Sequence, residues 1–362
     1  MQSESLAAVA APEAAMRRRY AGPIWTLIVL APVIGEVLSG STRLSFLFAL
    51  VPEMMVWGCG ALLCRELARR WQGGGPSLLC MGLALSVAEE FIIQQTSLAP
   101  LPFPGANAGY GRFWGVNWLY FLFMLGYESV WVVLVPVEVT ELLFPARRSQ
   151  PWLRKGGLIA NCLVFVVGAY IAWFAWTQQA LPKKMHVPPY HPPVSTIAAG
   201  VAAILLLMAV AYALRGVGLS NQNVSTHAVS KPAVNPWRPG LAALVMGSAW
   251  FQLISLVFNR TLLPVWIPLA AGCAGALLTY LLILHWSTRR AWEDRQRWSI
   301  AFGATLACVW VEYLSTVGWT RSDLVFKTTL DVLAVAGFLA LGRKVWQRTA
   351  ANWTESAGNI EP

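Results

Sequence analysis

Residues 77–97 read SLLCMGLALSVAEEFIIQQTS, and this stretch decides the fold class. The twelve residues before Glu89 carry no charge, and a helix needs about 20 mostly apolar residues to span a membrane. Similar runs recur along the chain, at 22–39, 44–65, 114–144, 156–177, 195–214, 239–258, 262–286, 299–318 and 325–345. We therefore predict an all-α, polytopic transmembrane helix bundle of about ten spans.

The composition agrees with a membrane protein. Of the 362 residues, 57% are hydrophobic and only 12% are charged, whereas soluble domains carry about 25% charged residues. The formal net charge of +10 would raise the question of nucleic acid in a soluble domain. Here the topology accounts for it, so we expect the lipid bilayer as partner and no nucleic acid; a protein or small-molecule partner is not predicted.

The positive charges predict the orientation. With the N-terminus inside, most of the 27 Lys and Arg residues fall at span ends that face the cytoplasm, as the positive-inside rule requires. The even number of spans then places both termini in the cytoplasm. As an alternative, Arg17–Arg19 followed by residues 24–37 resembles a cleaved signal peptide, although Pro32 and Glu36 are unusual inside such a segment.

The acidic residues divide the chain. Eight of the 17 Asp and Glu residues lie between Glu36 and Glu141, within or beside the first four spans, whereas the later six spans hold only Glu312 and Asp331. We therefore divide the chain into a disordered cytoplasmic N-terminus (1–20), an acidic four-helix membrane block (21–148), a six-helix membrane block (149–348) and a cytoplasmic tail (349–362).

Carboxylates inside a membrane are costly, by about 2.5–3.5 kcal/mol each at its centre, and usually mark a site or a pathway. Three of the eight lie near the cytoplasmic ends of their spans. Glu66 stands four residues before Arg70, which is the spacing of a helical salt bridge. Glu138 and Glu141 precede Arg147 and Arg148, so we expect all three carboxylates to form structural ion pairs.

The other five carboxylates are predicted to converge in the outer half of the bundle: Glu36, Glu53, Glu89, Glu90 and Glu128. Carboxylates that share a low-dielectric site cannot all be ionised, so they must hold protons, bind a cation or pair with a basic residue. The sequence thus predicts a buried carboxylate-rich site near the outer leaflet.

Three polar residues are predicted to join this site as substrate or cation ligands. Gln94 shares one face of the third helix with Glu89 and Glu90, and Arg112 and Asn117 fall at the same outer level. In the alternative interpretation, these side chains make separate hydrogen bonds between helices and have only a structural role. That alternative explains the adjacent Glu89–Glu90 pair least well.

The segment Glu89-Glu90-Phe91-Ile92-Ile93-Gln94 resembles the EExxxR motif of the CAAX-prenyl-protease-like (CPBP) family of intramembrane glutamic proteases. The resemblance implies that Glu89 or Glu90 is catalytic and activates a water, or binds a divalent metal that does so, within a helical bundle. This sequence departs from the family at two places. Gln94 stands where the motif has arginine, and the next helix, where the family has FxxxH, reads Phe123-Met124-Leu125-Gly126-Tyr127-Glu128, with no histidine.

A second resemblance covers more of the chain. Glu36-Val37-Leu38-Ser39-Gly40, Arg65-Glu66, Glu89-Glu90, Tyr110-Gly111-Arg112 and Glu141-Leu142-Leu143-Phe144-Pro145 are similar to an uncharacterised group of multi-span bacterial membrane proteins. Membership implies a multi-pass protein of the bacterial cytoplasmic (inner) membrane and no particular activity. Three hypotheses follow: an intramembrane hydrolase that uses Glu89 or Glu90, a proton- or cation-coupled transporter, and a structural or partner-binding protein.

Overall fold

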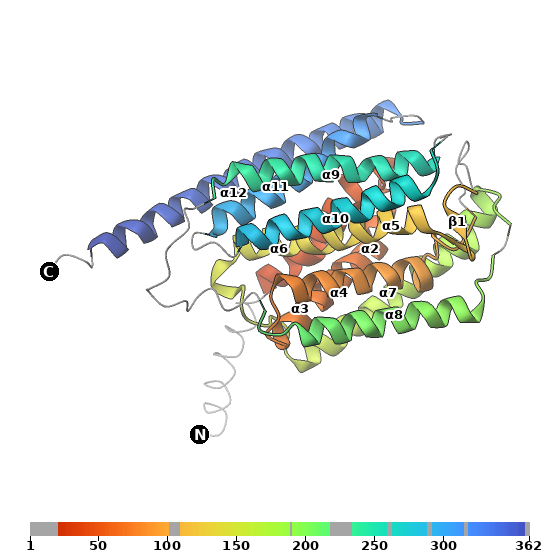
Figure 1. The fold of residues 1–362 in the computed structure, drawn as a ribbon, viewed down its shortest axis with the longest axis horizontal. Coiled ribbons are helices and arrows are strands. Elements are labelled where there is room, and N and C mark those ends of the chain that lie inside the picture. Colours follow the sequence, from red (N-terminus) through yellow and green to blue (C-terminus); the bar gives the residue numbers. More distant parts are fainter. Residues whose placement is uncertain are drawn as a thin grey trace, which may run out of the picture.

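The computed structural model describes residues 21–100, 109–188, 190–217, 234–258, 263–287, 292–314 and 318–358. It is an all-helical bundle whose helices run mostly along one common direction (Figure 1). Within the described residues, each of the ten predicted spans coincides with a helix. The disordered N-terminus predicted for residues 1–20 lies outside the described residues.

Four helices form the N-terminal part. The first extends over Ala21–Val37 and ends in the π-helical segment η1 (Val33–Val37). The second joins η2 (Leu44–Ala49), α2 (Leu50–Glu53), η3 (Met54–Gly58) and α3 (Cys59–Arg70). The third joins α4 (Gly75–Ala88) and η4 (Glu89–Ile93), and the fourth joins α5 (Trp118–Tyr127), η5 (Glu128–Leu134) and α6 (Val135–Leu143).

Six further helices follow the short turn η6 (Pro145–Arg147). They are α7 (Lys155–Trp173) with its continuation η7 (Phe174–Lys184), α8 (Val194–Ala213), α9 (Trp237–Phe258), α10 (Trp266–Ser287), α11 (Asp294–Val311) followed by η9 (Glu312–Leu314), and α12 (Arg321–Gly358). The C-terminal end of α12 projects beyond the bundle at the end opposite to β1 (Figure 1). The cytoplasmic tail was predicted to begin at residue 349, and this position falls inside α12.

Among the described residues, eight helices are long and apolar enough to cross a membrane, and Ala21–Val37 is a shorter apolar helix. The tenth, α11, begins with the charged residues Asp294, Arg295 and Arg297. Outward-facing side chains of α8 such as Leu205 and Leu206 are exposed and apolar, as expected for contact with lipid. The chain is a multi-pass membrane protein.

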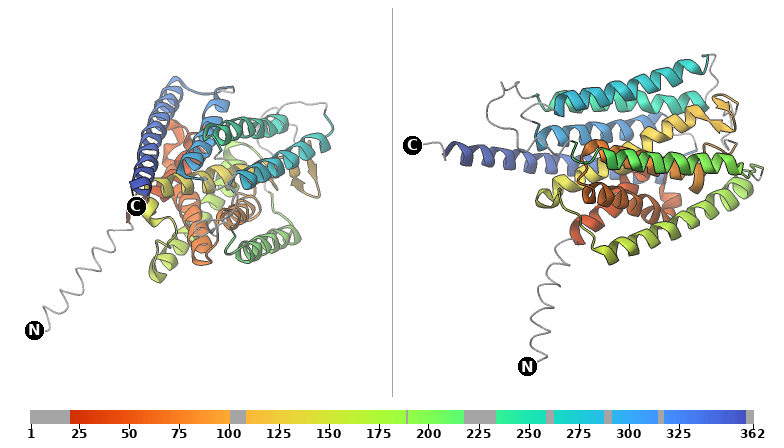
Figure 2. Two further views of the ribbon diagram at one scale, coloured as in Figure 1. Left: turned by 60° about the vertical axis from the view of Figure 1, so that its left-hand side comes forward. Right: turned by 60° about the horizontal axis from the view of Figure 1, so that its bottom comes forward.

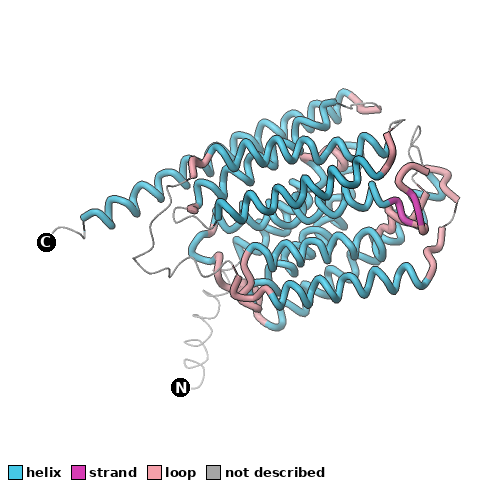
Figure 3. Tube along the Cα trace, in the orientation of Figure 1, coloured by secondary structure: helices cyan, strands magenta, loops and turns pink. Residues whose placement is uncertain are grey.

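The predicted start of the fourth helix at residue 114 is wrong, because a short hairpin occupies this stretch (Figure 3). Strands β1 (Arg112–Phe113) and β2 (Val116–Asn117) pair in antiparallel register. Gly111 and Gly115 both have φ of +79°, which glycine adopts without steric cost. The side chain of Asn117 then accepts a hydrogen bond from the backbone N–H of Tyr120 at 2.9 Å, and so caps α5.

The helices of the two predicted blocks share one apolar core. The largest cluster of buried apolar residues includes Ile34 and Leu119 from the first block and Phe251 and Val345 from the second. Helix α9 packs closely on α11, and α4 packs on α8 (Figure 2). A Cβ atom at Gly303 would lie 2.0 Å from the backbone oxygen of Gly240, so small residues set the close approach of α9 and α11.

Candidate functional site

Each of the first four helices has a π-helical segment next to a predicted site carboxylate. Glu36 lies within η1, Glu53 immediately precedes η3, Glu89 begins η4 and Glu128 begins η5. Direct evidence for the wider turn is the hydrogen bond from the backbone N–H of Gln94 to the backbone oxygen of Glu89, at 2.9 Å. Single π-turns in helices are rare and are frequent at functional sites.

These carboxylates are buried within the bundle. The exposed fractions are 6% for Glu53, 1% for Glu89, 0% for Glu90 and 1% for Glu128, and Glu36 is partly buried. We call Glu36, Glu53, Glu89, Glu90 and Glu128 the carboxylate cluster.

Only part of the cluster receives hydrogen bonds from protein donors. One oxygen of Glu53 accepts from the hydroxyl of Thr42. Glu90 Oε2 accepts from the backbone N–H of Ser97 at 2.8 Å and from the Ser97 hydroxyl. These bonds fasten Glu53 and Glu90 to the chain segments that flank their helices.

Glu89 and Glu128 differ from those two. Among the residues that the structure describes, no protein donor is in hydrogen-bonding position to either oxygen of Glu89 or of Glu128. The hydroxyl of Ser86 lies beside Glu128, but it donates to the backbone oxygen of Met124 at 3.0 Å. An unpartnered buried polar group is costly, so these two side chains are the most unusual feature of the site.

Most of the cluster lies near a tyrosine that the sequence analysis did not identify. Tyr120 in α5 is within electrostatic range of Glu36, Glu89, Glu90 and Glu128. Tyr127, the last residue of the same helix α5, donates from its hydroxyl to the backbone oxygen of Gly35 and to Ser39 Oγ, the latter at 2.9 Å. Nothing in the sequence distinguishes these tyrosines from the many aromatic residues at span ends.

The three predicted polar ligands take other positions. Arg112 donates to the backbone oxygens of Leu98, at 2.9 Å, and of Ala99 and Gly115. Asn117 is fully buried, and its side chain bonds to backbone groups of Tyr110 and Tyr120. Gln94 is partly buried at the end of η4. The contacts of Arg112 and Asn117 hold the outer loop together, and their role as ligands stays a prediction.

The geometry does not offer a ready metal centre. Among the described residues, no three or more His, Cys, Asp and Glu side chains are placed so that they could hold a metal ion. The divalent metal considered for Glu89 and Glu90 would therefore have to take its remaining ligands from outside this set.

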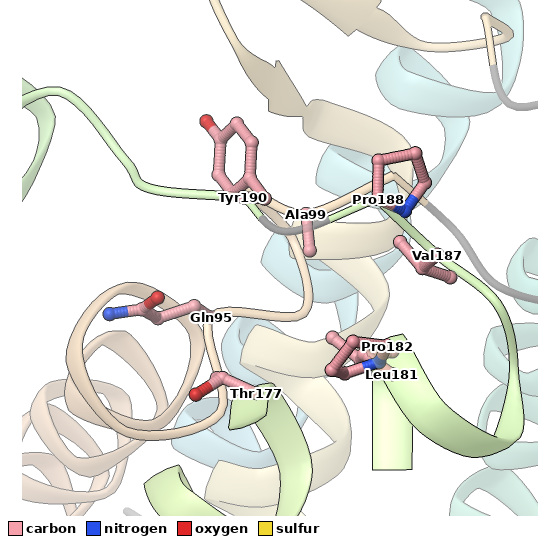
Figure 4. A pocket seen from close by; sticks show the side chains of 8 residues that line it. All are labelled: Gln95, Ala99, Thr177, Leu181, Pro182, Val187, Pro188 and Tyr190. Atoms are coloured by element: carbon pink, nitrogen blue, oxygen red, sulfur yellow. The ribbon is translucent and has the colours of Figure 1, made fainter. Parts of the chain in front are cut away.

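A small pocket lies at the outer ends of η4 and η7. Its lining includes Gln95, Thr177 and Tyr190 (Figure 4), and Gln95 follows the end of η4, with φ of +59°. The cavity volume is about 10 Å³, which is roughly the space that one water molecule needs. The lining residue Gln95 is five residues after Glu90 in the sequence. The pocket itself is too small for an organic substrate.

The three carboxylates predicted to form structural ion pairs, Glu66, Glu138 and Glu141, do so. Glu66 binds Arg65 at 3.1 Å and Arg70 at 3.5 Å, and its oxygens also accept from the backbone N–H groups of Trp152 and Leu153. This confirms the predicted pairing with Arg70.

Glu141 binds Arg69 at 2.8 Å, Arg65 at 3.2 Å and Arg297 at 3.2 Å, and Arg297 also pairs with Glu138. Ion pairing of Glu138 and Glu141 was predicted; the partners come from α3 and α11 rather than from the adjacent Arg147 and Arg148. We call these seven residues the basic network: Arg65, Glu66, Arg69, Arg70, Glu138, Glu141 and Arg297.

Comparison with known proteins gives the family. The model of an uncharacterized membrane protein family matches residues 26–354, which is most of the chain, so the protein belongs to that family. No curated protein and no solved structure matches the chain. The predicted resemblance to an uncharacterised membrane group is thus confirmed, whereas the resemblance to the CPBP proteases receives no support.

Proposed function

We propose that this protein is a proton-coupled membrane transporter whose proton site is the carboxylate cluster. The description of its family names no activity. The observation that carries the proposal is that four of these side chains lie within electrostatic range of Tyr120 and three of the four are fully buried, while Glu89 and Glu128 have no protein donor among the described residues. The charges of the bundle further suggest the bacterial cytoplasmic membrane, with both termini in the cytoplasm.

The physical argument begins with charge. An ionised carboxylate at the centre of a membrane costs at least about 2.5–3.5 kcal/mol, and like charges that share a site raise that cost further. Glu89 and Glu128 have no cationic partner among the described residues. The least costly state of the cluster is therefore one in which most of its carboxyl groups are protonated.

A cluster of coupled acids is suited to exchange protons. When several carboxyl groups interact, they titrate as a set, and the loss of one proton is shared among them. Exchange with solvent then needs only one opening to water. The π-helical turns beside Glu89 and Glu128 are candidates for this opening, because such turns are frequent at functional sites. Protons suit the site better than a metal ion, because no three ligands are placed for metal binding among the described residues.

Reconstituted vesicles test the proposal. We expect purified protein in liposomes that enclose a pH-sensitive dye to move protons when a potassium diffusion potential is imposed and the solutes of a broad panel are supplied in turn. The variants Glu89→Gln and Glu128→Gln should reduce this flux by about tenfold or more. Glu138→Gln is the matched control, because Glu138 belongs to the basic network, and it should retain the flux. Wild-type vesicles that stay as proton-tight as empty liposomes with every solute of the panel would refute the proposal.

One observation favours an intramembrane hydrolase as a second candidate. Glu90 is fastened by Ser97, whereas adjacent Glu89 is fully buried with both oxygens unbonded by described donors. This asymmetry fits a pair in which one carboxylate is positioned and the other activates a water. Cleavage of a membrane-embedded peptide library that is lost in Glu89→Gln, in a protein without proton flux, would favour the hydrolase.

A further inference from the structure

A buried ion pair lies in α12, outside the carboxylate cluster. Lys327 Nζ is 3.0 Å from Asp331 Oδ2, and the two side chains are only 3% and 7% exposed. Both lie in Arg321–Thr349, one of the helices long and apolar enough to span the membrane. An ion pair in such a position is costly, and the carboxylate cluster alone does not explain it.

The pair contacts the helix that carries Glu36. Lys327 Nζ donates to the backbone oxygen of Leu38 at 2.9 Å, two residues after Glu36. Asp331 Oδ2 accepts from the hydroxyl of Tyr313 at 2.7 Å, and Lys327 Nζ lies 5.1 Å from the centre of the Tyr313 ring. Tyr313 is 41% exposed, so its hydroxyl links Asp331 with the surface of the bundle.

Cys308 in α11 shows that the pair and the cluster are neighbours. Its thiol donates to the backbone oxygen of Ile34 at 3.8 Å, and it interacts electrostatically with Lys327, Asp331, Glu312 and Glu36. Lys327 and Asp331 of the pair and Glu36 of the cluster are therefore all within electrostatic range of one side chain.

Glu312 and Arg43 complete the charged surroundings of the pair. Glu312 interacts electrostatically with Lys327 and with Arg43. Its side chain lies against the backbone of Gly40, where a Cβ atom would be 2.6 Å from Glu312 Cγ. The turn after Glu36 is thus enclosed by charged groups from η9 and α12.

We propose that the Lys327–Asp331 pair is the exchangeable counter-charge of the carboxylate cluster, an inference that rests on the proposed proton site. When a proton passes from Glu36 to Asp331, an O–H bond breaks on Glu36 and one forms on Asp331. The Lys327 ammonium turns from Asp331 to the new Glu36 carboxylate. The net charge of the three groups stays the same, so the transfer avoids the cost of a new unpaired charge in the membrane. Lys327 is a positioning residue in this scheme.

Four variants test the role of Lys327. Lys327→Gln removes the cation, Lys327→Arg keeps it, and Lys327→Gln with Asp331→Asn removes the pair without leaving a buried charge. Arg148→Gln is the matched control, because it removes the cation of the Arg148–Asp294 pair far from the cluster. The readouts are proton flux in liposomes and the pH at which the infrared carbonyl band of protonated carboxylic acids disappears.

The proposal expects Lys327→Gln and the double variant to fold and to lose proton flux by about tenfold or more. In Lys327→Gln, the carbonyl band should disappear about one pH unit higher, because a nearby cation favours the ionised carboxylate. Lys327→Arg and Arg148→Gln should leave that pH within a few tenths of the wild-type value.

Two results would overturn the inference. One is wild-type flux and an unshifted band in the double variant, since the pair would then be structural only. The other is a Lys327→Gln variant whose flux and carbonyl band equal those of an active wild type. The proposed transport would then stand, but without the counter-charge. Conversely, a band that shifts in Lys327→Gln in a protein without flux would support the counter-charge and refute the transport.

Discussion

The basic network and the carboxylate cluster both contain buried carboxylates, largely on the same helices, and these carboxylates differ in their partners. Glu66 and Glu141 of the network are 0% exposed, and each of their oxygens accepts a bond from an Arg side chain or a backbone N–H. Glu89 and Glu128 are buried to the same extent, yet none of their oxygens meets a described protein donor.

The comparison teaches that burial alone does not tell what a carboxylate does. In the network, the planar guanidinium groups provide several fixed donors each, which suits stable pairing. Near the cluster along the chain, the described hydrogen bonds of Arg43 and Arg112 go to backbone oxygens. The network holds charges in place, whereas we propose that the cluster holds protons.

The largest expected effect is on the stability of the network. Glu141→Gln removes the charge that balances Arg65, Arg69 and Arg297. Breaking a buried ion pair on one side costs about 3–5 kcal/mol, so we expect the free energy of unfolding in detergent to fall by that amount. A loss below about 1 kcal/mol would show that the two regions do not differ in the way we describe.

The opposite sign is expected in the cluster. Glu128→Leu replaces a carboxyl group that lacks protein donors with an apolar group of similar size. Relief of an unsatisfied buried polar group is worth about 1–3 kcal/mol, so the free energy of unfolding should rise while proton flux is lost. Equal destabilisation by Glu128→Leu and Glu141→Leu in the same denaturation assay would remove the distinction.

A smaller effect is expected at Glu90, which accepts two hydrogen bonds from Ser97. Ser97→Ala deletes the hydroxyl that donates to Glu90, and the backbone N–H of Ser97 still donates. A single hydrogen bond to a carboxyl group contributes about 1 kcal/mol, which is the loss of unfolding free energy we expect. Ser86→Ala is the control: its hydroxyl bonds a backbone oxygen, and it should leave the carbonyl band of Glu90 unchanged, whereas Ser97→Ala should move it.

The smallest effect is expected at the edge of the network. Arg148 and Asp294 are paired at 2.7 Å, but their side chains are 31% and 21% exposed. Partly solvated ion pairs contribute between about 0 and 1 kcal/mol. Thermal unfolding of Arg148→Gln should therefore stay near the wild-type value, and a loss comparable to that of Glu141→Gln would mean that the pair is an integral part of the network.

Much of the fold was predictable because its physical signal is strong. Apolar runs of about 20 residues mark spans irrespective of how helices pack, and all ten coincide with helices in the described chain. The spacing of Glu66 and Arg70 likewise determines a contact within one helix. Partners from distant helices, such as Arg297 for Glu141, depend on packing that has no signal along the chain.

The site was predictable in its residues but not in its surroundings. Glu36, Glu53, Glu89, Glu90 and Glu128 stand out because charges are costly in apolar runs. The π-helical turns beside them have no recognisable sequence pattern. Lys327 lies at the start of the predicted span 325–345, and its four-residue spacing to Asp331 was the overlooked signal of a helical ion pair.

The infrared spectrum of the purified protein at neutral pH tests the central claim most directly. We predict a carbonyl band from protonated carboxylic acids that weakens in Glu89→Gln and Glu128→Gln and keeps its intensity in Glu138→Gln. A spectrum without this band, or a band that only Glu138→Gln weakens, would contradict the assignment of protons to the carboxylate cluster and of charges to the basic network.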